Sequence, residues 1–210
     1  MLMLGLGGGM LIAQLFCQQQ AVVDSVLAVE LSSTIIDMWW RDFYPTTVKP
    51  CLTIGSCYSN RSRSNSSTAM QEVHVVQDDA IAFTAKLAAN RTLARGISTA
   101  HSSDGCFRFI VVDCFAMDTA SSSGGSGDGE RVRPAEPSFT PTFLGHLRSL
   151  MCADDALLLI NTAPTDYDTE TMPLVAVVSK LFNDVRVRRK RRELLSGYNV
   201  VIAASVRPQN

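Results

Sequence analysis

The 210-residue sequence predicts an α/β domain with a mostly parallel, seven-stranded sheet, helices on both faces and an antiparallel hairpin at the C-terminal edge. Three observations lead to this prediction. Short apolar runs alternate along the chain with segments of helical periodicity, which favours a parallel sheet covered by helices. A glycine-rich turn follows the first apolar run. The last two strand-like segments have no helix between them, so they are expected to pair as a hairpin.

Each predicted element rests on a local pattern. The apolar runs predict strands over Leu2–Leu6, Ser25–Glu30, Glu72–Val76, Phe107–Asp113, Ala156–Asn161, Val185–Arg189 and Tyr198–Ala203. Helical spacing of apolar residues predicts helices over Met10–Phe16, Thr34–Phe43, Ile81–Leu93, Pro137–Met151 (from Thr140 onward) and Thr171–Asn183. Ser32 or Ser33 is the expected N-cap of the second helix, and Pro45 is expected to stop it.

The chain is predicted to be one domain over residues 1–210. Polar, low-complexity segments interrupt it at about 46–70, 98–105 and 119–137, where serine, asparagine and glycine predominate. Such compositions are typical of surface loops and insertions. These segments, and not a second domain, account for much of the length.

The charge balance excludes a general nucleic-acid binder. The chain has 19 Lys+Arg against 20 Asp+Glu, a net charge of −1, whereas such proteins carry a clear basic excess. The basic run Arg186–Arg192 alternates with valines, and edge strands commonly carry positive charge against aggregation. A nucleic-acid partner is therefore not expected, although contact with RNA or an acidic protein stays open. No histidine has a cysteine or acid at metal-ligand spacing, so no metal site is expected.

The cysteines and the N-terminal run bear on cellular location. Six cysteines lie at 17, 51, 57, 106, 114 and 152 without a CxxC pair, and this sparse pattern predicts reduced thiols in a cytoplasmic protein. The apolar run Met1–Phe16 lacks the positive region of a signal peptide and is too short to span a bilayer. No membrane association is expected.

The glycine turn is the strongest local signal for a binding site. Gly5, Gly7 and Gly9 fit G-x-G-x-G, with Gly8 between the last two. Glycines between a first strand and its helix let a ligand approach backbone N–H groups closely. Glu30 ends the second strand, 21 residues after Gly9, where a carboxylate can accept hydrogen bonds from ribose hydroxyls. The alternative is that Glu30 is merely a solvated acid.

Further acids follow the third and fourth predicted strands. Asp78 and Asp79 come after the third strand, and Asp113 ends the fourth. Ligands of open α/β sheets bind outside the carboxyl ends of the strands, so these acids and Glu30 are expected along one edge. Alternatively, Asp78 or Asp79 caps the next helix, and Asp113 solubilises a loop.

These stretches resemble the spermidine-synthase-like branch of the class I S-adenosylmethionine-dependent methyltransferases. The similar segments are Leu4–Gly9, Val29–Leu31, Gln77–Ala80, Phe109–Asp113, Leu157–Asn161 and the terminal pair Val185–Arg189 and Tyr198–Ile202. Among members of this branch, the chain is most similar to the eukaryotic methyltransferases that modify an elongation factor. The resemblance implies a Rossmann-like class I methyltransferase fold over nearly the whole chain.

The resemblance also implies roles for individual residues. Gly5, Gly7, Gly8 and Gly9 would pass under the methionine portion of S-adenosylmethionine, and Glu30 would hold its ribose. Asp79, with Asp78 as the rival, would face the adenine amino group. Asp113, as the catalytic residue, would lie beside the sulfonium and the acceptor, and Phe115 is a candidate for an apolar wall. The implied activity is methylation of a protein side chain or N-terminus. A homodimer is the expected assembly.

Departures from the family pattern keep other functions open. Leu31–Ser33 stands where the family has Asp-Pro after the acid. Ala116 replaces the second acid that holds the diamine in polyamine synthases, which favours methyl transfer over aminopropyl transfer to a polyamine. Because family members have a hairpin or lid before the glycine strand, the sequence is expected to be truncated or to have an open site. A non-catalytic cofactor-binding paralogue is a further alternative, and the terminal hairpin disfavours an NAD-dependent dehydrogenase.

Overall fold

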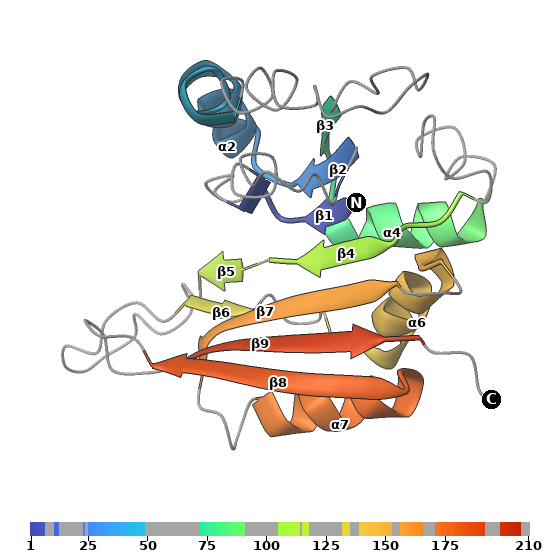
Figure 1. Ribbon diagram of the computed structural model, residues 1–210. Coiled ribbons are helices and arrows are strands. Elements are labelled where there is room, and N and C mark those ends of the chain that lie inside the picture. Colours follow the sequence, from blue (N-terminus) through green and yellow to red (C-terminus); the bar gives the residue numbers. More distant parts are fainter. Residues whose placement is uncertain are drawn as a thin grey trace, which may run out of the picture.

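A seven-stranded mixed sheet forms the centre of the molecule (Figure 1). The computed structural model describes residues 1–6, 11–12, 23, 25–48, 72–90, 105–113, 115–117, 132–134, 139–152, 156–165, 171–191 and 198–206. The strands, in sheet order, are β3 (Glu72–Gln77), β2 (Ser25–Glu30), β1 (Leu2–Leu4), β4 (Phe109–Val112), β7 (Leu157–Thr165), β9 (Tyr198–Ser205) and β8 (Asp184–Arg191). The first five run parallel, and β9 is antiparallel to both β7 and β8. The predicted sheet, including its terminal hairpin and its basic edge strand, is confirmed.

Helices cover both faces of this sheet. On one face lie α4 (Ala80–Ala89), α6 (Pro141–Leu150) and α7 (Met172–Leu181), seen beside β4, β7 and β8 in Figure 1. On the other face, α2 (Ser33–Met38) continues into a π-helix, η1 (Trp39–Val48). No helix of the described residues is long and apolar enough to cross a membrane.

The side chains of the central strands alternate between two hydrophobic clusters. Leu2 and Leu4 of β1 join the cluster under α4, α6 and α7, whereas Met3 joins the cluster with Trp39. β2 and β4 follow the same period of two. Because both faces are buried, these strands read in the sequence as continuous apolar runs and not as alternating ones.

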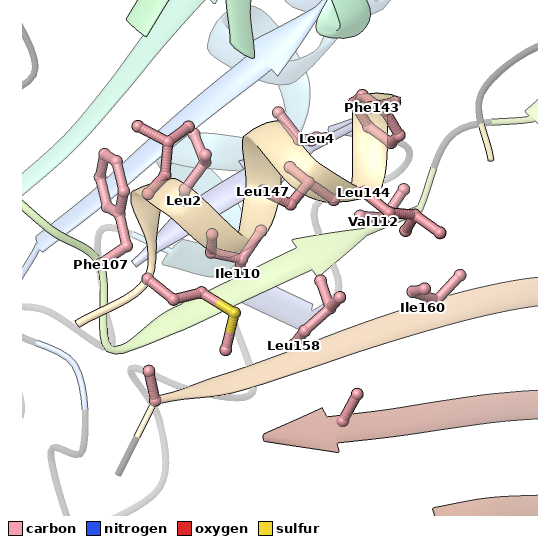
Figure 2. Close-up of a cluster of buried hydrophobic side chains, with 14 of the residues drawn as sticks. Leu2, Leu4, Phe107, Ile110, Val112, Phe143, Leu144, Leu147, Leu158 and Ile160 are labelled. Atoms are coloured by element: carbon pink, nitrogen blue, oxygen red, sulfur yellow. The ribbon is translucent and has the colours of Figure 1, made fainter. Parts of the chain in front are cut away.

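Helix α6 covers the middle of the larger cluster (Figure 2). Its residues Phe143, Leu144 and Leu147 are at most 1% exposed and lie over the strand residues labelled with them in the figure. The Thr140 hydroxyl accepts a hydrogen bond from the Phe143 amide (3.2 Å), and Pro141 occupies the first turn. These are common features of a helix N-terminus, and they confirm the predicted start at Thr140.

The second predicted helix differs from expectation at Pro45. Ser32 caps α2, as predicted, but Pro45 lies inside η1 and does not stop it. In an α-helix a proline ring clashes with the carbonyl four residues earlier, whereas the wider π-helical turn removes that constraint. Trp39 is buried against the sheet, whereas its neighbour Trp40 is 42% exposed.

A short two-stranded ribbon was not predicted. β5 (Phe115–Met117) pairs antiparallel with β6 (Val132–Pro134), which lies within the predicted insertion at 119–137. The ribbon is defined by backbone pairing between two three-residue segments, and neither segment is long enough to show a strand pattern in the sequence. Most of the predicted helix over Met10–Phe16, and residues 49–70 and 98–104 of the other two insertions, lie outside the described residues.

The prediction of reduced thiols was wrong for one pair of cysteines. Cys106 and Cys152 form a disulfide between residues 46 positions apart. Neither lies in a CxxC motif, so the sequence carries no local signal for the pairing. Between them, Phe107 and Met151 form a parallel bridge, with the Phe107 amide donating to the Leu150 carbonyl (2.8 Å) and the Cys152 amide donating to the Phe107 carbonyl (3.1 Å).

Reduction of this disulfide is expected to lower the stability of the domain. By the chain-entropy relation, a crosslink spanning 46 residues stabilises the fold by up to about 4 kcal/mol. The melting temperature should fall by several degrees when dithiothreitol is added, and Cys152→Ser should show the lower value with or without reductant. An unchanged melting temperature after complete reduction, verified by thiol titration, would contradict this expectation.

Candidate functional site

The parallel pairing brings the carboxyl ends of five strands to one edge of the sheet. β1 lies between β2 and β4, so successive strands extend away from it in opposite directions. The edge beside β1 and β4 is therefore the topological switch point, where open α/β sheets bind ligands. Four features predicted from sequence follow strands at this edge: Gly5 after β1, Glu30 at the end of β2, the pair Asp78 and Asp79 after β3, and Asp113 after β4.

The turn after β1 needs a glycine at its first position. Gly5 has φ of 85°, a conformation that side chains disfavour. Its amide donates to the Val29 carbonyl (2.8 Å), which continues the pairing with β2 as the chain turns. Gly7, Gly8 and Gly9 lie outside the described residues, so their predicted contacts stay predictions.

Glu30 is bonded directly to this turn. One carboxylate oxygen, Oε2, accepts a hydrogen bond from the Leu6 backbone amide (2.9 Å). The other, Oε1, accepts one from the Ser32 backbone amide (2.9 Å). Glu30 is only 9% exposed, so the alternative of a freely solvated acid is wrong. Each oxygen has further acceptor capacity, and the two amides fix the orientation of the carboxylate.

The two acids after β3 have separate local roles. Oδ1 of Asp79 accepts the Ala82 amide (2.8 Å) and caps α4. Asp78 pairs with Lys86 of the same helix (2.8 Å), and this hydrogen bond lowers the pKa of the Asp78 carboxyl. The Asp78 amide also donates to the Glu30 carbonyl (3.2 Å), which joins this turn to β2. Capping by Asp79 matches the alternative derived from the sequence, and a contact with adenine stays a prediction.

Asp113 sits beside both the glycine turn and β7. Its amide donates to the Leu4 carbonyl (2.7 Å), and its Oδ1 accepts the side-chain amide of Asn161 (2.8 Å). Burial raises the pKa of the Asp113 carboxyl, and the Asn161 hydrogen bond partly opposes that effect. This partly buried acid is therefore not a loop solubiliser, and a perturbed carboxyl at a switch point is typical of functional sites.

Sequence reasoning missed the roles of two neighbouring residues. The sequence predicts Asn161 only as the end of its strand, whereas the structure places it within β7, with its side-chain amide bonded to Asp113 after the adjacent β4. Leu31 was noted only as a departure, but its side chain is 67% exposed immediately after Glu30. The available sequence signal for Leu31 is an apolar residue that directly follows the acid at the end of a predicted strand. No group of three or more potential metal ligands occurs in the described ranges.

Comparisons with known proteins agree with this geometry. No protein-family model matches the chain, and no curated protein does. Solved structures do match: human methyltransferase-like protein 13 in complex with SAH has a TM-score of 0.55 at 20% identity, covering 99% of this chain and 72% of that one. The chain has the class I methyltransferase fold.

Spermidine synthases share this methyltransferase fold. One in complex with the transition-state analogue AdoDATO gives a TM-score of 0.57 at 17% identity, and the Thermotoga maritima enzyme gives 0.55 at 15%. The match covers 98% of this chain in both cases but only 54% and 53% of those proteins. The chain thus spans about half the length of the spermidine synthases that it matches.

The Asp113→Asn variant is expected to be more stable than the wild type at neutral pH. Because the folded-state pKa lies above the ordinary value of 3.8, protonation of Asp113 favours the folded state, and that contribution is lost as pH rises through the folded pKa. An amide stays neutral throughout. Thermal unfolding should show a gain for Asp113→Asn at pH 7 that shrinks towards pH 4. Asp184→Asn, at the opposite edge, is the control, and equal stability at pH 7 would contradict the expectation.

Variants of Asp79 separate helix capping from ligand binding. Asp79→Ala removes the cap and should destabilise the domain by about 1 kcal/mol, whereas Asp79→Ser retains a capping oxygen and should cost little. If the Asp79 carboxylate also binds adenine, both variants should weaken binding of S-adenosylmethionine in calorimetry. Unchanged affinity in Asp79→Ser would restrict Asp79 to capping.

Proposed function

We propose that this protein is an S-adenosylmethionine-dependent methyltransferase that acts on a protein side chain or N-terminus. The observation that carries the proposal is the bond between the Glu30 carboxylate and the Leu6 amide. It joins the acid at the end of β2 to the glycine turn after β1, within the class I methyltransferase fold. In dinucleotide-binding α/β folds an acid after the second strand binds a ribose hydroxyl beside such a glycine turn.

The residues at this edge fit the cofactor. Glu30 Oε1 and Oε2 each accept one backbone amide and keep acceptor capacity for the two ribose hydroxyls. Gly5 turns the backbone away at positive φ, which allows a close approach of the methionine portion. The exposed side chain of Leu31 offers an apolar surface next to Glu30 for the adenine ring.

The bound cofactor would supply an electrophilic methyl group on a sulfonium. The chain's own residues need to orient the reactants and exclude water, because direct displacement depends on alignment more than on strong acid–base groups. Asp113 lies at the switch point with one oxygen held by Asn161. Its carboxylate stabilises positive charge nearby, which suits a nitrogen acceptor that becomes cationic as the methyl group arrives.

Two alternatives are retained as outcomes of the experiment. Aminopropyl transfer to a polyamine would need a second acid beyond Asp113, and Ala116 occupies that position in β5. A non-catalytic paralogue would bind the nucleoside without turnover.

A homodimer and a cytoplasmic location stay proposals. The Cys106–Cys152 bond argues against the cytoplasmic location, because disulfides persist mainly in oxidising environments.

The full chain is expected to bind S-adenosylmethionine in isothermal titration calorimetry. Glu30→Ala should weaken binding several-fold to about tenfold, since each lost hydrogen bond costs about 1 kcal/mol. Asp184→Asn removes a carboxylate from the opposite edge and should bind like the wild type.

The outcomes separate the alternatives. Absence of wild-type binding at high micromolar concentration would contradict the proposal. Incubation of the chain with decarboxylated S-adenosylmethionine and putrescine, followed by amine analysis, would yield spermidine only if the aminopropyl alternative holds. Binding without labelling of any protein by methyl-labelled cofactor would support the paralogue.

A further inference from the structure

The side chain of Asn161 bridges the two strands that flank the switch point on one side. β4 and β7 pair in parallel from Phe109 opposite Leu157 to Val112 opposite Ile160. The next residues along each strand are Asp113 and Asn161, so the register places them side by side. Parallel pairing ends here because Asp113 leaves the strand, and the two side chains bond to each other at 2.8 Å.

The backbone around Asn161 is fixed from the opposite side. Asn161 pairs with Val201 of the antiparallel strand β9, and the register shifts between Asn161 and Pro164. The next residue, Thr162, donates its hydroxyl to the Val200 carbonyl (3.1 Å). Asn161 is therefore the last residue of β7 before the register with β9 shifts, and its backbone is fixed by pairing with Val201.

The two ends of the Asn161 amide have different surroundings. The nitrogen donates to Oδ1 of Asp113, whereas the buried Oδ1 of Asn161 accepts no hydrogen bond from the described residues. Burying an unpaired polar atom is costly, so the amide is not placed there for stability alone. Oδ1 of Asp113 is the oxygen that accepts from Asn161, and no hydrogen bond to the second oxygen, Oδ2, occurs within the described residues.

We propose that Asn161 is a positioning residue that orients the Asp113 carboxylate and stabilises its charged form by hydrogen bonding, with Oδ2 presented to the positive charge of the bound reactants. This inference rests on the proposed function and assigns a residue whose role is indirect. Donation from an amide favours the charged form of a carboxyl. Asn161 thus counters the burial that favours the neutral acid.

Few ionisable side chains stand on the described strands next to Asp113. β1 and β7, the strands on either side, contain no ionisable side chain, and β5, which follows Asp113, contains none. Arg133 of β6 is the one ionisable residue of the β5–β6 ribbon. Among the described residues, burial and the Asn161 hydrogen bond act in opposite directions on the pKa of the Asp113 carboxyl.

The first test measures the titration of Asp113 in the full chain by carbon-13 NMR of its carboxyl group, without any ligand. Asn161→Leu removes the donor at similar size, and the titration midpoint should rise by about one pH unit or more, the scale of a hydrogen bond to a charged group. Thr162→Val is the matched control, because it removes a neighbouring buried hydrogen bond of β7 that does not involve Asp113. Its midpoint should equal that of the wild type.

The outcomes of this test are decisive. A midpoint in folded Asn161→Leu equal to that of the wild type would overturn the proposal. If Asn161→Leu does not fold, Asn161→Asp serves instead: it has the same size and adds a second carboxyl, so one of the two acids should titrate at a clearly higher pH. Midpoints of both acids close to the wild-type value would again overturn it.

The second test uses the charge difference between two probes, S-adenosylmethionine and S-adenosylhomocysteine. An ionised Asp113 should favour the cationic sulfonium of S-adenosylmethionine. The affinity for S-adenosylmethionine relative to that for S-adenosylhomocysteine should therefore fall as pH drops through the Asp113 titration. In Asn161→Leu the fall should occur at a higher pH, and in Asp113→Asn it should disappear. An unshifted profile in Asn161→Leu would count against the inference, whereas failure of the wild type to bind either probe would overturn the proposed function and leave the NMR test standing.

Discussion

The position of β1 between two parallel neighbours is the constraint on which the rest of the structure depends. β1 has three residues, and each pairs with β2 on one side and with β4 on the other. This double pairing fixes where both neighbours end, so Glu30 and Asp113 flank the same turn. A shift of either neighbour by one residue would exchange its side chains between the two clusters.

Hydrogen bonds then join the strand ends into one continuous edge. The Asp78 amide bonds to Glu30, Glu30 bonds to Leu6, and the Asp113 amide bonds to Leu4. Asn161 extends the series to the fifth strand. Asp78, Glu30 and Asp113 are thus each bonded to a neighbouring strand or turn, and a ligand at this edge would meet groups that are already oriented. Such preorganisation lowers the free energy that binding must spend on ordering side chains.

The strands and the order of elements could be predicted from the sequence because each buried strand is a short apolar run between turns. The π-helix through Pro45 could not, since propensity argues that proline kinks or ends a helix, and the sequence carries no separate signal for the wider turn. The β5–β6 ribbon and the disulfide depend on contacts between distant segments. At the site, Gly5, Glu30 and Asp113 were found from spacing. The partner of Asp113 was not found, because the pairing of Asp113 with Asn161 follows from strand register across 48 residues.

The Cys106–Cys152 bond has a topological consequence. It closes a covalent ring that contains β4, β5, β6 and α6, together with Asp113. A cut in the chain anywhere within that ring leaves the two pieces covalently connected. The strand that carries Asp113 and the strand that carries Asn161 would then stay on one molecule even after the connecting chain is broken.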